Sequence, residues 1–534
     1  MDVSGSSRSL PENAYRKLES GETYTPVVPA ATIVPELTAY SLGWGILFAV
    51  LFSAASAYLG LKIGQVFEAA IPITILAIGL SSKKKNALQQ NVMIQSIGSA
   101  SGVVVAGAIF TLPGIYILGL AEYTNFGQMF LASLLGGVLG ILLLIPFRRY
   151  FVKDMHGEFP FPEATASTEV LMAGEAGGGQ AGLLLKSGAF AAAYQLLSQT
   201  FGLWRETFST TAFSWGHNMS MKLRLEFNMM TEAAIVGLGY IIGLRYALII
   251  ACGSFLSYYV MTPMIGLLGK GVTINHEIDG IKTATTYALP ELVGMPTEEI
   301  FASFVRPVGI GAIAMAGMIG VWKSRDIIMG AFKLAGQAGK QGGPDGKVER
   351  TEQDLPMNLV TTGLILTFLA VFVFFLFSVK VTLVQAIIGL LLVAGISFLF
   401  TTVAARAIAI VGTNPVSGMT LMTLIITSVV LKMVGLSGPE GIVAALLIGG
   451  VVCTALSMSG GFVSDLKIGY WLGTTPKVQQ KWKFVGTVVA ALSVTPVIMM
   501  LAQTPGFTGP DALAAPQATA MASLIEPLMT SRSR

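Results

Sequence analysis

Long apolar runs separated by short polar connections dominate this chain. Several runs reach the roughly 20 apolar residues that a helix needs to cross a bilayer. They are continuous, whereas membrane-spanning strands alternate between apolar and polar residues. The pattern therefore predicts an all-α polytopic membrane protein with about 13 transmembrane segments. We expect these segments near residues 37–61, 66–81, 92–119, 126–147, 181–203, 231–245, 246–268, 303–321, 357–378, 381–403, 408–434, 441–459 and 484–503.

Some of the predicted segments are short or interrupted, which indicates broken or re-entrant helices. The runs at 66–81 and 231–245 are short for a full crossing. Gly and Pro interrupt the runs at 92–119 and 408–434. Irregular backbone at membrane depth is tolerated where it is buried in protein or lines a wet cavity. These interruptions are therefore candidate parts of a transport pathway.

The interruption Gly412-Thr-Asn-Pro-Val-Ser-Gly-Met-Thr420 carries polar side chains. Pro415 removes a helix hydrogen bond, and the glycines allow unusual backbone angles. Asn414, Ser417 and Thr420 would then present polar groups at depth, as the broken helices of transporters do. The alternative is a proline kink that packs against neighbouring helices.

A motif that occurs twice predicts an internal duplication. Phe159-Pro-Phe-Pro-Glu-Ala-Thr-Ala166 follows an apolar run, and Ala515-Pro-Gln-Ala-Thr-Ala520 repeats its second half late in the chain. A Gly- and Pro-containing interruption precedes each copy. The resulting organisation is a flexible cytoplasmic tail, a first transmembrane repeat, a cytoplasmic linker and an incomplete second repeat, over 1–35, 36–321, 322–356 and 357–534 respectively.

Composition supports a membrane protein without metal or cofactor sites. Hydrophobic residues make up 53% of the chain and charged residues 12%, whereas soluble domains carry about 25% charged residues. The two cysteines and three histidines are isolated, without the spacing of metal ligands or of a CxxC motif. No metal, disulfide or cofactor is therefore expected.

Lysine and arginine gather on one set of connections, which predicts the orientation. With the N-terminus inside, the basic groups at 83–85, 148–153, 323–356 and 467–483 all fall on the cytoplasmic side. The connections on the opposite side are nearly free of lysine and arginine. We therefore expect a multi-pass protein of the inner (plasma) membrane with a cytoplasmic N-terminus.

The first copy of the repeated motif offers candidate carboxylates. Pro162 suits the first turn of a helix, and Glu163 would lie near its positive end. Thr165 and Glu169 share one helix face, which we expect to line a cavity or a partner helix. Glu68 is a further carboxylate within a predicted segment. Such groups can exchange protons or meet a cationic substrate; solvated glutamates at a capped helix start are the alternative.

Other polar residues in apolar runs are further candidates for the pathway. Gln95 and Ser99 fit a pore lining or close helix packing equally well. Asp465 and Lys467 are expected at the inner end of a segment, where an ion pair in a loop is the alternative. Gln517 occupies the place of the glutamate in the second copy of the motif.

The motifs of several enzyme classes are absent from the sequence. It contains no Gly-x4-Gly-Lys-[Ser/Thr] and no His-Glu-x-x-His. No aspartate lies deep in a predicted segment, which argues against an intramembrane aspartyl protease. We therefore expect no enzyme and no catalytic residues, and energy for uphill movement would come from an ion gradient.

Several motifs occur together in a characteristic order. These are Ala57-Tyr-Leu-Gly-Leu-Lys-Ile-Gly64, Ile109-Phe-Thr-Leu-Pro113, the repeated motif, the Gly412 interruption and Asp465-Leu-Lys-Ile-Gly-Tyr-Trp-Leu-Gly473. Over residues 36–522 the chain resembles the oligopeptide transporter family. The closer similarity is to its prokaryotic branch, which is related to the yellow stripe-like transporters of metal chelates.

The resemblance implies a proton-coupled importer of oligopeptides or of metal-chelate and siderophore-like compounds. It points to the Asn414–Gly418 break and the Glu163 helix as cavity-lining parts. Its implied partners are protons, a small peptide or metal chelate and the lipid bilayer, with homo-oligomer formation left open and no nucleic acid. Family members continue beyond the second motif copy, so we expect missing C-terminal segments. A passive channel and a truncated, non-transporting member are the alternatives.

Overall fold

In the computed structural model the chain forms two compact units, Met1–Ala181 with Ala316–Ser531 and Gly182–Met315 with Arg532–Arg534. Two helices, α8 (Gly179–Gln199) and α15 (Arg306–Lys323), cross the boundaries between these ranges. The structure describes residues 10–64, 66, 69–81, 84, 86–175, 179–205, 207–268, 272–278, 281–287, 297–323, 349–412, 416–509 and 512–530.

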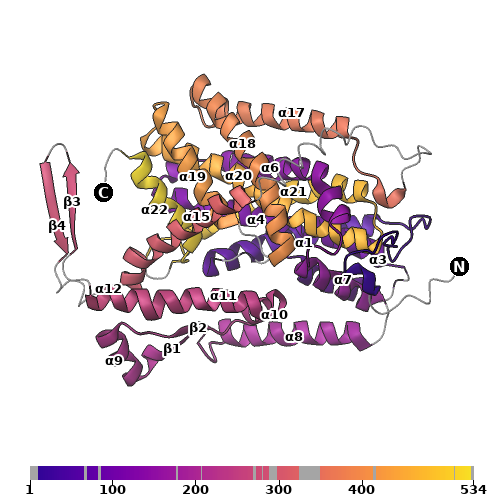
Figure 1. The fold of residues 1–534 in the computed structure, drawn as a ribbon, viewed down its shortest axis with the longest axis horizontal. Helices are drawn as coiled ribbons and strands as arrows, with labels where there is room; N and C mark the ends of the chain where they lie inside the picture. The colour runs from indigo at the N-terminus through magenta and orange to yellow at the C-terminus, as the bar shows by residue number, and fades with distance from the viewer. Residues whose placement is uncertain are drawn as a thin grey trace. The chain divides into compact units, whose positions relative to one another are not determined.

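Among its described residues, the regular elements of the first unit are all helices (Figure 1). The N-terminal part supplies α1 (Ala39–Ile63), α2 (Ala70–Ser81), α3 (Leu88–Gly98), α4 (Ala100–Thr111), α5 (Pro113–Ile117), α6 (Phe126–Leu144) and α7 (Pro162–Glu175). The C-terminal part supplies α17 (Met357–Val373), α18 (Leu383–Val411), α19 (Val416–Met433), α20 (Gly438–Leu472), α21 (Pro476–Gln503) and α22 (Pro516–Met529). Short 3₁₀ or π-helical turns lie at Glu12–Ala14, Ala121–Tyr123, Ile145–Phe147, Tyr150–Asp154, Arg350–Glu352 and Phe374–Ser378.

The 35-residue helix α20 forms the core of the first unit. Its most apolar stretch is entirely buried, and it packs against α4, α6, α18 and α19, among which Figure 1 shows it. An ideal Cβ atom on Gly136 of α6 would lie 2.3 Å from the carbonyl oxygen of Val451. One on Gly140 would lie 2.3 Å from the carbonyl oxygen of Ala455. The glycines therefore allow α6 and α20 to approach backbone to backbone, as in other membrane helix pairs.

Local sequence signals set the ends of several helices. Capping boxes, in which two side chains satisfy free backbone amides reciprocally, begin α1, α6 and α18 at Thr38, Asn125 and Thr382. Left-handed glycines end α1, α18 and α20 at Gly64, Gly412 and Gly473. Glycine adopts this conformation without a Cβ penalty and therefore ends helices sharply.

The prediction of an all-α polytopic membrane protein is confirmed. In the described part of the chain, 8 helices are long and apolar enough to cross a membrane, compared with the 13 or so predicted segments. Several predicted segments are instead short or divided. α2 and α19 are shorter apolar helices, the run at 92–119 is divided into α3, α4 and α5, and 231–268 is divided among several helices of the second unit.

Other helices extend further than the apolar runs predicted. α18 continues to Val411, whereas the predicted segment ended at residue 403, and α20 continues to Leu472, beyond the predicted end at 459. α21 begins at Pro476, eight residues before the predicted start at 484. In α20 and α21 the extra turns contain charged residues that are buried inside the protein. A local hydropathy pattern assigns charged residues such as these to loops. In the structure, buried partners stabilise them within a helix.

Residues 10–38 lie along the end of α20, where the sequence analysis expected a flexible tail up to residue 35. The amides of Val27 and Val28 donate to the carbonyls of Trp471 and Leu472 at 3.1 and 3.2 Å. The Tyr24 hydroxyl donates to the Trp471 carbonyl at 2.9 Å. The last carbonyls of a helix lack intrahelical donors, and this N-terminal segment, hereafter the strap, supplies them.

The second unit contains further helices and two short pairs of antiparallel strands, which the sequence did not predict. Besides α8 and α15, its elements are β1 (Thr207–Ser209), α9 (Ser214–Leu223), β2 (Asn228–Met230), α10 (Ala233–Ile242), α11 (Leu244–Phe255), α12 (Thr262–Leu268), β3 (Val272–Ile278), β4 (Ile281–Tyr287) and α14 (Thr297–Ile300). Thr207 pairs with Met230, and Val272 pairs with Tyr287. Short 3₁₀ or π-helical turns lie at Thr210–Ala212, Leu256–Met261 and Phe301–Val305.

Gly140→Ala is expected to lower the thermal unfolding midpoint of the purified protein in detergent. The added Cβ must push α6 away from the Ala455 carbonyl, and overpacking of this kind costs about 1–3 kcal/mol. Gly43→Ala in α1 is the control, because a Cβ there meets nothing within 4 Å. Equal midpoints for the two variants would contradict the close packing of α6 on α20.

Candidate functional site

The end of α18 meets the start of α7. Gly412 ends α18 with φ +76°, and an ideal Cβ on it would lie 2.6 Å from Cγ of Pro162, the first residue of α7. The amide of Phe161 donates to the carbonyl of Ala409 in α18 at 2.8 Å. Phe161 has φ 42°, which is uncommon for a residue with a bulky side chain. The two helices are therefore joined by a tight contact that tolerates no side chain at position 412.

The end of α1 meets the start of α22 in the same way. Gly64 ends α1 with φ +79°, and an ideal Cβ on it would lie 2.7 Å from Cγ of Pro516, the first residue of α22. The amide of Ala515 donates to the carbonyl of Leu61 at 2.8 Å. Ala515 has φ 37°. Every feature of the first junction thus has a counterpart in the second.

The two junctions connect the N-terminal and C-terminal parts of the chain crosswise. α1 belongs to the N-terminal part and meets α22 of the C-terminal part, whereas α18 of the C-terminal part meets α7 of the N-terminal part. The repeated motif supplies the helix start in each junction, and the glycine interruption supplies the helix end. Backbone groups at helix ends lack intrahelical partners, and transporters use such ends to bind substrates and ions.

A buried ion pair lies between α20, α21 and the broken segment α3–α4. Lys483 Nζ lies 2.7 Å from Asp465 Oδ2, and both side chains are almost completely buried. Gln95 Nε2 donates to Asp465 Oδ1 at 2.7 Å, and the Ser99 hydroxyl donates to Oδ2 at 2.9 Å. Lys483 also donates to the carbonyl of Ser96 at 3.0 Å. The carboxylate therefore has partners on both oxygens, as a buried charge requires.

The helical hairpin α20–α21 brings the two charges level. α20 ends at Leu472 and α21 begins at Pro476, after the three residues 473–475. Asp465 lies two helical turns before this connection, and Lys483 lies two turns after it. In an antiparallel hairpin, residues equally far from the turn lie at the same height along the helix axes. The two charges of the pair thus come from neighbouring helices of one hairpin. The hydrogen bonds from Gln95 and Ser99 come from α3–α4, which is far away in the sequence.

Lys467, two residues after Asp465, faces a different environment. Its Nζ donates to the carbonyl of Val152 at 2.8 Å. The rings of Phe161, Tyr470 and Trp471 surround it, with centroids 5.4, 4.7 and 5.0 Å from Nζ. Asp465 and Lys467 therefore do not form the loop ion pair that the sequence analysis weighed. Both are buried in a continuous helix.

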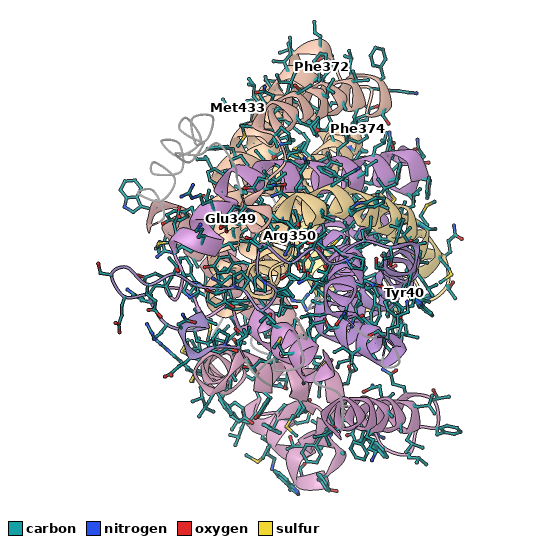
Figure 2. The ribbon with its side chains drawn as sticks, turned by 90° about the vertical axis from the view of Figure 1, so that its right-hand side faces the viewer. Tyr40, Glu349, Arg350, Phe372, Phe374 and Met433 are labelled. Carbon is teal, nitrogen blue, oxygen red and sulfur yellow. The ribbon has the colours of Figure 1, made fainter. Side chains whose placement is uncertain are left out.

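Charged residues from separate segments meet beside the α20–α21 connection. Arg350, labelled in Figure 2, forms an ion pair with Glu36 of the strap and donates to the carbonyl of Gly473 at 2.8 Å. Arg148, after α6, lies with Nε 2.6 Å from Asp354 Oδ1. Segments that the sequence analysis assigned to one side of the membrane thus lie together at one end of α20.

Comparison with known proteins identifies the family. Residues 36–533 match the family model described as OPT oligopeptide transporter protein. The chain belongs to this family. It is also similar to a protein of Haemophilus influenzae named "Putative oligopeptide transporter", with 27% identity over 512 residues that cover 89% of this chain and 76% of that protein. The resemblance read from the sequence motifs is confirmed.

In this OPT family member, the predicted residues of α7 occupy different environments. Glu163 is 6% exposed at the start of the helix, beside the Gly412 junction. The Thr165 hydroxyl donates to the carbonyl of Pro160 at 3.1 Å, close to its own helix start. Glu169 is exposed and accepts a hydrogen bond from the Tyr15 hydroxyl at 2.9 Å. On α7, Thr165 is thus half-buried and Glu169 is exposed.

The other predicted residues are distributed between the two junctions and the core. Gln517 Nε2 donates to the carbonyl of Gly64 at 3.3 Å, which places it at the second junction. The buried Thr420 hydroxyl donates to Cys453 Sγ at 2.9 Å, and Ser417 is half-buried in the first turn of α19. Asn414 and Glu68 lie outside the described residues. The roles predicted for all of these residues stay predictions.

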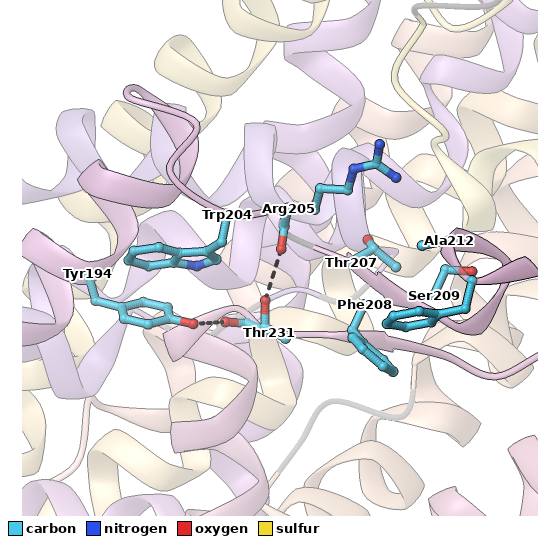
Figure 3. Close-up of a pocket in the computed structure, with 9 residues that line it drawn as sticks. Tyr194, Trp204, Arg205, Thr207, Phe208, Ser209, Ala212 and Thr231 are labelled. Atoms are coloured by element: carbon cyan, nitrogen blue, oxygen red, sulfur yellow. Dashed lines mark hydrogen bonds between the residues drawn. The ribbon is translucent and has the colours of Figure 1, made fainter.

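A separate cavity lies within the second unit. It has a volume of about 450 Å³ and an aromatic lining that includes Tyr194, Trp204 and Phe208 (Figure 3). The Tyr194 hydroxyl donates to the carbonyl of Thr231 at 3.0 Å, and the Thr231 hydroxyl donates to the carbonyl of Arg205 at 3.4 Å. No residue singled out in the sequence analysis as a pathway candidate lines it. Elsewhere in the described ranges, no three His, Cys, Asp or Glu side chains could hold a metal ion together.

Lys483, a buried member of the ion pair with Asp465, is a residue that sequence reasoning missed. It was assigned to a cytoplasmic connection because the apolar run resumes only at residue 484. Gly473 and Pro476 carried the signal, because glycine ends helices and proline starts them. A hairpin turning at these residues places Lys483 opposite Asp465. Gln95, Ser99 and Asp465 were predicted separately, and the structure brings the three together.

Asp465→Asn and Lys483→Met are each expected to lower the thermal unfolding midpoint strongly. Each change leaves the partner's charge buried and uncompensated, which costs about 3–5 kcal/mol. The double variant should have a higher unfolding midpoint than either single variant, because neither residue then leaves a buried charge without its partner. Lys153→Met breaks a more exposed pair with Glu352 and is the control, with an expected cost of about 0–1 kcal/mol. Losses that simply add in the double variant would contradict direct pairing.

Proposed function

We propose that this chain is a secondary transporter that imports oligopeptides together with protons. Family membership and the relative named as an oligopeptide transporter support the peptide substrate. Metal chelates are the second substrate class that the motifs imply. Because the sequence contains no P-loop motif, an ion gradient is the energy source that this proposal requires.

The pair of crossed helix junctions is the observation that carries the proposal. Each junction places a left-handed glycine against a proline at the first position of another helix. Helix ends that meet inside a bundle of apolar helices expose backbone amides and carbonyls where no water would otherwise compete. Discontinuous helices of this kind form the substrate and ion sites of many transporters. The pathway of this protein would therefore pass beside the junctions.

The matching junctions also support the internal duplication. In this proposal residues 36–321 form one repeat and 357–534 form the other, with 322–356 as the linker. α1 then corresponds to α18, and α7 corresponds to α22. Glu163 and Gln517 are equivalent residues at the second position of α7 and α22. With Asn414 and Ser417, they are proposed to line the pathway at the two junctions.

The buried charges support coupling to an ion gradient. Ionisable residues inside membrane segments are costly, and they commonly mark ion pathways and proton relays. Asp465, Lys467 and Lys483 all lie buried in helices long and apolar enough to cross a membrane. Glu68, Thr165 and Glu169 remain proposed participants near this pathway.

The location of the ion pairs supports the proposed orientation. The strap, the segment after α6 and residues 349–356 meet at the end of α20. Their many lysines and arginines fit the cytoplasmic face of the inner membrane. The N-terminus would then be cytoplasmic.

Purified protein in proteoliposomes is expected to accumulate labelled trialanine above the external concentration when the outside is acidic. A protonophore should abolish this accumulation, because it removes the driving gradient. Competition by unlabelled tripeptides and tetrapeptides, but not by an iron–siderophore complex, would support peptides as the substrate. Equilibration without accumulation would instead indicate a passive channel and would contradict coupling to protons.

Gly412→Ala and Gly64→Ala are each expected to reduce uptake strongly. Both place a Cβ within 3 Å of a proline in the facing helix and force the junction to open. Gly435→Ala is the matched control, because Gly435 has the same left-handed conformation, φ +79°, with nothing near its Cβ position. All three variants share the backbone strain of about 1–2 kcal/mol. Equal uptake by all three would remove the junctions from the mechanism.

A further inference from the structure

Lys467 differs from the other buried charges of the first unit. It is 1% exposed, and within the described part of the chain no carboxylate pairs with it. Its Nζ hydrogen bond goes to the carbonyl of Val152. By contrast, Lys483 pairs directly with Asp465, and Arg148 pairs with Asp354. Among the residues that the structure describes, Lys467 is therefore a buried cationic group that no anion neutralises.

The surroundings of Lys467 accommodate both of its protonation states. The faces of Phe161, Tyr470 and Trp471 lie within the distance at which aromatic rings attract a cation. A protonated lysine has three N–H donors, and the single carbonyl of Val152 satisfies one of them. The neutral amine can keep that same hydrogen bond. Gain or loss of the proton therefore breaks no ion pair.

The neighbouring carboxylate is bound into a structural ion pair. Asp465 pairs with Lys483 and accepts further hydrogen bonds from Gln95 and Ser99. Protonation of this carboxylate would leave the Lys483 charge buried without its partner, which is strongly destabilising. Of the two charged groups two residues apart on α20, Lys467 is the one that can titrate without this penalty.

Lys467 also contacts the junction between α18 and α7. Phe161, one of its three rings, immediately precedes Pro162 and donates its amide to Ala409 of α18. It adopts the left-handed conformation that few bulky residues adopt. The Val152 carbonyl belongs to the π-helical turn Tyr150–Asp154, between α6 and α7. The charge on Lys467 therefore acts on both ends of the connection that leads into α7.

We propose that Lys467 carries the proton that is coupled to transport. In its ammonium form it attracts the Phe161 ring and holds the α18–α7 junction closed. The proton enters from the outside and is released to water on the cytoplasmic side. Its release leaves a neutral amine, weakens the attraction to the Phe161 ring and allows the junction to open. In this step one N–H bond of Nζ breaks, its electron pair stays on nitrogen, and an O–H bond forms on the accepting water. This inference rests on the proton coupling proposed above and names the residue responsible for it.

Other ionisable groups lie near Lys467 and belong to its environment. Tyr470 on α20 contacts Lys467 directly, and His156 between α6 and α7 lies close enough to interact with its charge. Tyr24, Arg148, Asp154 and Glu352 surround Tyr470 in turn. Asp465, two residues before Lys467 on α20, pairs with Lys483 of α21. His156 hydrogen-bonds through Nδ1 with the Tyr470 hydroxyl at 3.1 Å. Burial lowers the pKa of His156, so it is neutral at pH 7 and adds no fixed charge.

A substrate carboxylate is a less suitable partner for Lys467 than a proton. The ammonium group is enclosed by three rings and a backbone carbonyl, and a peptide terminus would need space next to it. At 1% exposure that space is absent around this side chain. A proton requires none. Binding of a carboxylate is nevertheless one of the outcomes that the experiment separates.

Tryptophan fluorescence tests whether Lys467 titrates, independently of transport. Trp471 lies beside Lys467, so a change of charge should alter its emission as the detergent-solubilised protein is titrated from about pH 5 to pH 9. Lys467→Met, Lys467→Arg and Trp471→Phe are expected to remove this component, because arginine stays protonated throughout. His156→Gln should keep it. An unchanged titration in both Lys467 variants would overturn the proposal.

Uptake in proteoliposomes tests the coupling itself. Lys467→Met and Lys467→Arg are expected to reduce gradient-driven trialanine accumulation by about tenfold more than trialanine exchange at equal pH. Lys432→Met is the matched control, because the exposed Lys432 also donates to a backbone carbonyl, that of Leu528 at 2.9 Å. Lys432→Met should lower neither the accumulation nor the exchange of trialanine.

The remaining outcomes are distinguishable. Lys467→Met could lose exchange and accumulation equally while Lys467→Arg keeps both at the level of the unmodified protein. This result would show that Lys467 binds a carboxylate, and it would overturn the proposal. Parental accumulation in both Lys467 variants would overturn it as well. If the unmodified protein itself ignores the pH gradient, the proposed proton coupling fails, whatever the fluorescence titration shows for Lys467.

Discussion

The buried pair of Asp465 and Lys483 constrains the arrangement of the first unit. Two charges removed from water are tolerated only if they pair closely and their remaining hydrogen-bonding capacity is met. Gln95 and Ser99 meet that requirement from the break between α3 and α4. The pair therefore fixes the heights of α20, α21 and the broken segment relative to one another. Any displacement of one helix along another would leave a charge without its partner.

The crossed junctions explain why the N-terminal and C-terminal parts form one unit. Each part supplies one helix end and one helix start, and each start contacts the end from the other part. Neither set of helices could therefore close its junctions alone. α20 lies at the centre of this arrangement, and glycines on α6 bring the two backbones into direct contact. Small residues thus replace the hydrophobic driving force that helices lack in lipid.

The two buried lysines illustrate how surroundings divide the roles of similar residues. Lys483 lies opposite a carboxylate, so its charge is part of the structural framework. Lys467 lies among aromatic rings next to the Phe161 junction, and no carboxylate in the described part of the chain pairs with it. In the mechanism proposed here, the first pair keeps the helices in place while the second lysine changes charge. Because the Asp465–Lys483 pair keeps the helices in place, a change of charge on Lys467 would act mainly on the helix junction beside it.

The sequence by itself determined the helical membrane fold and the family, because continuous apolar runs and short motifs are local properties. It also singled out Gln95, Ser99, Asp465 and Lys467 one by one. Only the tertiary structure decided which of them meet, because Ser99 and Asp465 are 366 positions apart. The sequence pattern also did not predict the full length of α20 and α21. A charge counts as a loop signal in a hydropathy pattern, and whether it is instead buried depends on a partner that the local sequence does not contain.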